Sequence, residues 1–230
     1  MFLIGVQELG EGYRKFSKDE NHQKDRLISK MMESPIAINT ADANTQHYEL
    51  PAEFFNLVLG EHNKYSGCVW EKGIKTLTEA ETESLKIYCA RAKILDGMKV
   101  LELGCGWGSL SLWIATHYPN THVTAVSNSK IQRQFILNLR NKRGLTNLDI
   151  ITADMNTFQP YTQFDRVLSI EMFEHMRNYK TLLSRIKSWL NPDGKLFIHI
   201  FCHRKYPYFF EVEGIHNWMG RYFFSGGIMP

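Results

Sequence analysis

The sequence predicts an α/β fold, an open and largely parallel β-sheet with helices packed against it. From Met98 onward, five short runs rich in Val, Ile and Leu alternate with longer segments of helical character. The runs show little polar alternation, which is typical of strands buried on both faces by crossover helices. A Pro-Asp-Gly turn at 191–194 precedes the last run. With 230 residues and 43% hydrophobic content, the chain is long enough to bury a full core.

Ahead of the predicted sheet, residues 1–75 are polar and irregular, and we expect an N-terminal helical and lid segment there. Within it, LPAEFFNLVLG (50–60) indicates a short helix, because a proline near the first turn precedes apolar residues. A second helix is expected to begin at Thr78, since Thr78 and Glu81 have the spacing of a capping box. This helix would open the core domain, which we place at residues 76–203.

The core domain is expected to alternate strands with helices. The expected strands are KVLELG, HVTAVS, LDIITAD, FDRVLSI and KLFIHIF, and the expected helices are SLSLWIATHY, SKIQRQFILNLRNKRG and KTLLSRIKSWL. A third segment, residues 204–230, is too rich in Tyr, Phe and Trp for a solvated tail. We expect it to fold back over the sheet or over a ligand crevice, or to meet a partner.

The composition argues against several classes of protein. The net charge is +3, and the Lys and Arg residues are scattered, so we expect a solvated surface and no nucleic-acid partner. The four cysteines form no C-x-x-C pair, so we expect neither a metal site nor a disulfide framework. No apolar run approaches the roughly 20 residues of a membrane span, and MFLIGV is too short for a signal peptide. We therefore expect no transmembrane segment and a cytoplasmic protein.

A glycine-rich turn links the first predicted strand to its helix. In VLELGCGWGSL (100–110), glycines occupy every second position from 104 to 108. The carboxyl end of a strand in an open α/β sheet is where ligands bind, and glycines let a ligand lie directly on the backbone. The dinucleotide fingerprint is excluded, because its third glycine position is Ser109 and the second strand ends in Val126 and Ser127 without an acid. A tight turn alone would not require three glycines in five residues.

The spacing E-x-G-x-G-x-G resembles the first motif of S-adenosylmethionine-dependent methyltransferases. Further segments resemble one group in order and spacing: YSGCVW (65–70), SNSKIQ (127–132), ADM (153–155), EMFEHMRNYKTLL (171–183) and LFIHIFCH (196–203). They are similar to the cyclopropane-fatty-acid-synthase and coclaurine N-methyltransferase superfamily, over residues 47–230. EMFEHMRNY is closer to the plant alkaloid N-methyltransferases than to the fatty-acid synthases. The resemblance implies a class I methyltransferase, Rossmann-like sheet and S-adenosyl-L-methionine as cofactor.

The resemblance also implies which residues hold the cofactor. Tyr65 and Ser66 would close over the methionine, and Gly104, Cys105 and Gly106 would form the backbone bed beneath it. Ser127, Asn128 and Gln132 would contact the ribose, and Asp154 and Met155 would contact the adenine. Ordinary roles stay open for some of these, since Ser127 could cap the strand and Met155 could be a core residue. We expect Cys105 to act as a small hydrophobe rather than as a reactive thiol.

Three candidate catalytic residues lie just past the fourth predicted strand. An aliphatic amine is mostly protonated at neutral pH, so a carboxylate or imidazole beside the methyl donor could accept its proton. Glu171, Glu174 and His175 match the residues that bind the amine and remove its proton in the alkaloid enzymes. The alternative is a carboxylate–histidine pair that only fixes the loop.

Two departures from the family leave other functions open. The fatty-acid synthases carry a cysteine after Tyr-Ser that helps to hold a bicarbonate base; here that position is Gly67, and a cysteine follows at Cys68. His199 does match the histidine of that bicarbonate site, although it could equally be a core histidine. N-methylation of a small hydrophobic amine is our first hypothesis. Methylene transfer to an unsaturated lipid acyl chain is the second, and an inactive cofactor-binding protein is the third.

The other departure is length. The family has two more strands after LFIHIFCH, which form a hairpin at the edge of the sheet. We expect a truncated chain in which these final hairpin strands are missing and KLFIHIF is the edge strand. Because an unpaired strand edge is a template for pairing with another chain, self-association is expected.

Overall fold

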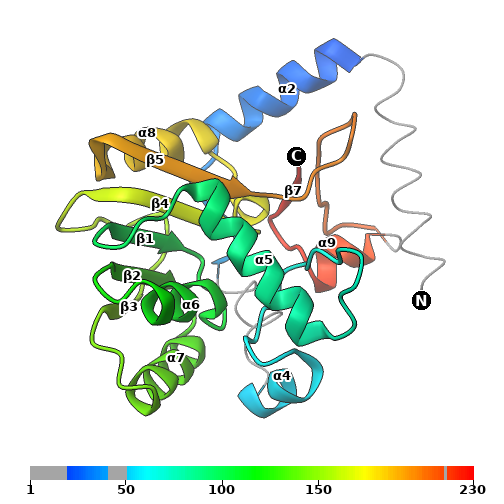
Figure 1. The fold of residues 1–230 in the computed structure, drawn as a ribbon. Helices are drawn as coiled ribbons and strands as arrows, with labels where there is room; N and C mark the ends of the chain where they lie inside the picture. The colour runs from blue at the N-terminus through cyan, green and yellow to red at the C-terminus, as the bar shows by residue number, and fades with distance from the viewer. Residues whose placement is uncertain (1–19, 41–50, 215–216) are drawn as a thin grey trace. The chain divides into compact units, whose positions relative to one another are not determined.

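The structure contains the expected parallel sheet (Figure 1). It is a computed structural model that describes residues 20–40, 51–214 and 217–230. The strands are β1 (Lys99–Leu103), β2 (His122–Ser127), β3 (Leu148–Thr152), β4 (Phe164–Ile170) and β5 (Leu190–His199). Their order is β3-β2-β1-β4-β5, and every neighbouring pair is parallel. The predicted α/β fold is therefore confirmed, and β5 is an edge strand of this sheet.

The chain divides into two compact units. The larger unit comprises Tyr48–Glu171 and Ile186–His199 and holds the sheet, and the smaller comprises Met1–His47, Met172–Arg185 and Ile200–Pro230. One helix, α8 (Tyr179–Trp189), has residues in both.

In the larger unit, helices cover the sheet and supply its core. They are α4 (Ala52–Val58), α5 (Leu77–Ala92), α6 (Ser109–His117) and α7 (Lys130–Lys142). Helix α5 packs on β5 and α6, whereas α6 and α7 pack on β2 and β3 (Figure 1). The buried side chains of β1 meet fully buried residues of these helices, such as Leu85, Ile114 and Ile136. Burial of both sheet faces explains why the strand sequences lack polar alternation.

The smaller unit is built from short elements. Its helices are α2 (Glu20–Glu33), the single 3₁₀ turn η1 (Phe173–His175) and α9 (Trp218–Tyr222), and β6 (Tyr208–Phe209) pairs antiparallel with β7 (Ile228–Met229). Many aromatic side chains of residues 204–230 pack within this unit; the rings of Phe210 and Phe224 stack at 4.8 Å. Within the described residues, no helix combines the length and apolar character needed to cross a bilayer.

Two local predictions were wrong. Helix α5 is capped by Thr76, not Thr78: Thr76 forms the capping box with Glu79, because the sequence TLTEAE contains the box spacing twice. The N-terminal segment, for which helical structure was expected without bounds, contains α2, and Leu27 and Met31 anchor this helix to Ile228.

The second wrong prediction concerns the turn at 191–194, which lies within β5 instead of before it. Pairing with β4 moves from Phe164–Leu190 to Arg166–Lys195, so one intervening residue on β4 faces four on β5. The Pro-Asp-Gly segment is therefore a bulge in an edge strand, where an unpaired N–H costs little.

Candidate functional site

The glycine turn after β1 is fixed to the end of β2. The backbone N–H groups of Gly104 and Cys105 both donate to the carbonyl of Val126, at 2.9 Å each. Gly104, Gly106 and Gly108 have φ values of +74°, +54° and +82°, a region that side chains rarely adopt. The backbone of this turn therefore favours glycine at all three positions.

The surroundings of Gly106 and Gly108 differ, and the difference separates their roles. A Cβ atom on Gly108 would lie 2.7 Å from Ile136, so this glycine lets α6 and α7 pack closely. A Cβ atom on Gly106 would meet nothing within 4 Å. The open space above this bare, left-handed backbone, just ahead of the first residue of α6, leaves room for a ligand.

The end of β2 carries a buried polar pair. The Ser127 hydroxyl donates to Oε1 of Gln132 at 2.7 Å and accepts the Ser129 N–H at 3.0 Å. Gln132 is only 1% exposed, and its buried Nε2 finds no hydrogen-bond partner in the described part of the chain. A buried donor without a partner is costly, and a ligand hydroxyl would satisfy it. Ser127 thus caps the end of the strand, while Nε2 of Gln132 is available as a donor. Asn128, which lies between these two residues in the sequence, is half-buried.

The segment after β3 lies beside this pair. The Ala153 N–H donates to the carbonyl of Ser127 at 3.0 Å, which joins the ends of β2 and β3. The carboxylate of Asp154 accepts the Asn156 N–H at 2.7 Å, and Met155 is buried. Asp154 therefore forms part of a turn, and its predicted adenine contact stays a prediction, as does that of Met155.

Aromatic packing and one hydrogen bond connect the Tyr-Ser segment to the strand ends. Tyr65 is 43% exposed, and its ring lies edge-on against Phe55 of α4 at 5.4 Å. Phe55 packs on Trp107, which follows Gly106, at 4.5 Å. On the other side, the Gly67 N–H donates to Oε1 of Glu171 at 3.2 Å. The larger unit thus brings together the predicted cofactor residues and Glu171.

Glu171 has an unusual backbone conformation. Its φ is +51°, and its N–H donates to the carbonyl of His199 at 2.8 Å. A non-glycine residue in this region costs about 1–2 kcal/mol, and such strain is concentrated at functional sites.

Glu174 and His175 belong to η1 in the smaller unit. Glu174 is fully buried, and its Oε1 accepts the Phe201 N–H at 2.8 Å. The ring of His175 is tilted against Phe224 at 5.4 Å. The three predicted catalytic residues, which share one motif, are thus divided between the two units.

Residues that the sequence did not single out organise the loop before Tyr65. The buried carboxylate of Glu81 accepts the N–H groups of Gly60, His62 and Lys64 at 2.8, 2.9 and 3.2 Å. Lys64 is buried and donates to the hydroxyl of Ser66 at 2.7 Å. In the sequence, Lys64 is marked only by its position before Tyr65, and a lysine on the surface would have the same sequence pattern.

A buried acid also lies in β1, within the glycine motif. Glu102 is buried and accepts a hydrogen bond from the Ser111 hydroxyl of α6. Burial, opposed in part by the bonds from Ser111, raises the pKa of Glu102 to about 7.

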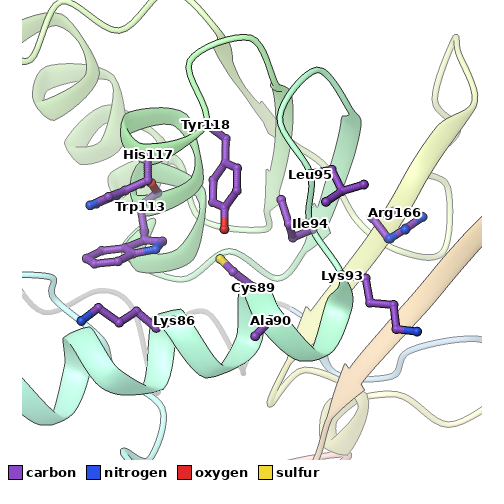
Figure 2. A pocket seen from close by; sticks show the side chains of 10 residues that line it. All are labelled: Lys86, Cys89, Ala90, Lys93, Ile94, Leu95, Trp113, His117, Tyr118 and Arg166. Carbon is purple, nitrogen blue, oxygen red and sulfur yellow. The ribbon is translucent and has the colours of Figure 1, made fainter.

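A cavity of about 770 Å³ lies elsewhere, between α5 and α6 (Figure 2). Figure 2 shows Trp113 beside His117, with the Tyr118 hydroxyl pointing towards the sulfur of Cys89. Leu95, just before β1, and Arg166, near the start of β4, also line it, so it lies toward the amino ends of the strands. Since the glycine turn is at the carboxyl ends, this cavity is not the predicted cofactor site.

Comparisons with known proteins give one family. Residues 37–230 match the mycolic acid cyclopropane synthetase family. The chain is 38% identical over 230 residues, 99% of its length, to (S)-coclaurine N-methyltransferase of Thalictrum flavum subsp. glaucum, covering 64% of that protein. It is 30% identical over 187 residues to cyclopropane-fatty-acyl-phospholipid synthase of Escherichia coli (strain K12), covering 80% of this chain and 46% of the synthase.

A solved structure matches nearly the whole chain. The crystal structure of coclaurine N-methyltransferase bound to N-methylheliamine and S-adenosylhomocysteine superposes with a TM-score of 0.91 at 36% identity. The match covers 99% of this chain and 67% of that one. The chain spans less than two thirds of the length of either curated relative named above.

Proposed function

Because the chain belongs to the mycolic acid cyclopropane synthetase family, we propose that it is an S-adenosylmethionine-dependent methyltransferase that N-methylates a small, hydrophobic amine. One observation carries this proposal. A carboxylate, that of Glu171, is held in a strained conformation at the end of β4, in the same unit as a glycine turn with open space above Gly106. The similarity to coclaurine N-methyltransferase supports the choice of an amine acceptor.

The residues at the carboxyl ends of β1, β2 and β3 fit the proposed cofactor. The bare backbone at Gly106 leaves room for it, and the unpaired Nε2 of Gln132 can donate to a ribose hydroxyl. The proposed set of cofactor-binding residues is completed by Tyr65, Ser66, Gly104, Cys105, Ser127, Asn128, Asp154 and Met155. When bound, S-adenosylmethionine would supply an electrophilic methyl group; the chain would hold the cofactor and prepare the acceptor.

Preparing the acceptor means removing a proton from an ammonium group. We assign this task to Glu171, Glu174 and His175. A carboxylate attracts the cationic amine and lowers the cost of holding it near the site, and a carboxylate or imidazole accepts the proton. Glu171 is kept in place by the Gly67 N–H and Glu174 by the Phe201 N–H.

Methylene transfer to an unsaturated acyl chain is the second candidate, and similarity to cyclopropane-fatty-acyl-phospholipid synthase favours it. Two features weigh against it. Gly67 stands where the synthases carry a cysteine, and the Nδ1 atom of His199 is engaged by the hydroxyl of Tyr88 at 2.7 Å.

The test supplies methyl-labelled S-adenosylmethionine to the chain with either of two acceptors. One is a panel of arylalkyl amines that includes heliamine; the other is vesicles of phospholipid with unsaturated acyl chains, with and without bicarbonate. We expect label in the amines, at a rate that rises with pH until the free base predominates. Label in lipid only, with bicarbonate dependence, would favour the second candidate. Calorimetry with S-adenosylhomocysteine tests cofactor binding separately.

A further inference from the structure

Lys64 is a buried lysine whose ammonium group has fixed neighbours. Its side chain is only 2% exposed, and Nζ donates to the Ser66 hydroxyl at 2.7 Å and to the carbonyls of Ser66 and Gly67. The ammonium also lies 5.0 Å from the centre of the Tyr88 ring. All three ammonium hydrogens therefore have acceptors, which is how a buried charge is tolerated without a carboxylate partner.

The ring that the Lys64 ammonium faces belongs to Tyr88, a residue buried in α5. The Tyr88 hydroxyl lies 2.7 Å from Nδ1 of His199, the last residue of β5. Lys64, Tyr88 and His199 thus lie in contact one after another within the larger unit, and we call these three residues the Lys64–His199 chain.

The Tyr88 hydroxyl fixes the direction of its bond to His199. A phenol has a single hydrogen to donate, and Nδ1 of His199 is an acceptor 2.7 Å from the Tyr88 oxygen. The phenol hydrogen is therefore directed to Nδ1 of His199. An imidazole whose Nδ1 accepts a hydrogen bond carries its proton on Nε2.

We infer that Lys64 and Tyr88 are positioning residues, which hold His199 as the neutral imidazole protonated at Nε2. In the described part of the chain Nε2 makes no hydrogen bond, so it is left as a donor for a ligand. His199 is then not the proton acceptor of the proposed methylation, and that task stays with Glu171, Glu174 and His175. This last step rests on the proposed function; the protonation of His199 does not.

The charges around His199 agree with a neutral ring. Burial is the largest influence and lowers the pKa of His199. Glu171 raises this pKa, whereas Lys64 and Arg91 lower it, and the net change is downward. For Tyr88, burial and the nearby Glu171 raise the pKa, so the phenol keeps the hydrogen that the chain requires.

The experiment is nitrogen-15 NMR of the full chain with labelled histidine. The nine histidines require an assignment, which comes from the signal lost in His199→Gln. In the wild type we expect the shift pattern of a single tautomer protonated at Nε2. In Tyr88→Phe, which keeps the ring and removes the hydroxyl, we expect a mixture of tautomers and a higher pKa of His199. Lys64→Met, which keeps the apolar stem, should raise the pKa of His199, because the ammonium charge lowers it.

Lys86→Met is the matched control, because Lys86 is an exposed lysine of the same helix as Tyr88. It should leave the His199 signals unchanged. A proton on Nδ1 in the wild type, or a Tyr88→Phe spectrum identical to the wild type, would overturn the inference. If Lys64→Met does not fold, Tyr88→Phe still decides. Absence of methylation with the expected NMR spectra would refute the proposed function and leave the inference standing.

Discussion

Gly106 and Gly144 form a matched pair that isolates ligand contact from backbone strain. Gly106 has φ +54° and Gly144, just after α7, has φ +64°; at either position an added Cβ meets nothing within 4 Å. Gly106→Ala and Gly144→Ala should therefore cost similar strain, about 1–2 kcal/mol. At roughly 2–4 °C of melting temperature per kcal/mol for a chain of this size, both should melt roughly 2–8 °C below the wild type.

Affinity for S-adenosylhomocysteine should separate the two variants. The new methyl group of Gly106→Ala would occupy the proposed ligand space, so we expect calorimetry to show at least about a tenfold loss, or about 1.4 kcal/mol. Gly144→Ala should bind like the wild type, and Gly106→Val should bind less than Gly106→Ala. Equal affinity of Gly106→Ala and Gly144→Ala would show that the turn is not the binding site.

Three further predictions concern other features of the chain. Glu174→Gln or His175→Ala should slow amine methylation far more than it weakens S-adenosylhomocysteine binding; comparable losses in both would mean that the pair only fixes the loop. Burial raises the pKa of Glu102 from 4.5 to about 7, so its contribution to stability is fully present below pH 4.5 and is lost as the pH rises to 7. The loss in the free energy of unfolding is at most about 3 kcal/mol. Urea titrations at several pH values should show that the free energy of unfolding of Glu102→Gln depends less on pH in this window than that of the wild type. An unchanged pH dependence would count against a buried acid. Because β5 has a strand partner on one side only among the described residues, the chain should self-associate at tens of micromolar, roughly where such edges do so; light scattering from a stable monomer would contradict this.

The sheet and the glycine turn could be predicted because their signals are local. Strands buried on both faces are mostly apolar, and a backbone with positive φ at 104, 106 and 108 favours glycine. The start of α5 was missed by two residues because two overlapping capping boxes compete, and only burial of Glu81 decides between them.

The interior of the site could not be predicted, because its contacts join residues far apart in the chain. Tyr88 and His199 are separated by 111 positions, and nothing in YCARA or LFIHIF indicates that they meet. Lys64 has no local mark that distinguishes a buried lysine from a solvated one. Closeness in the sequence was also a poor guide to which residues share a unit, since Glu171 and Glu174 belong to one motif but to different units.

Because Glu171 has a left-handed conformation, the residue that favours stability at this position differs from the residue that the proposed chemistry uses. Glycine adopts this conformation without strain, whereas glutamate does not. A library at this position selected for thermal stability alone should therefore enrich Glu171→Gly. With the role that we propose for Glu171, a library selected for methylation should discard this variant, so that stability and activity would not both be maximal with a single residue there.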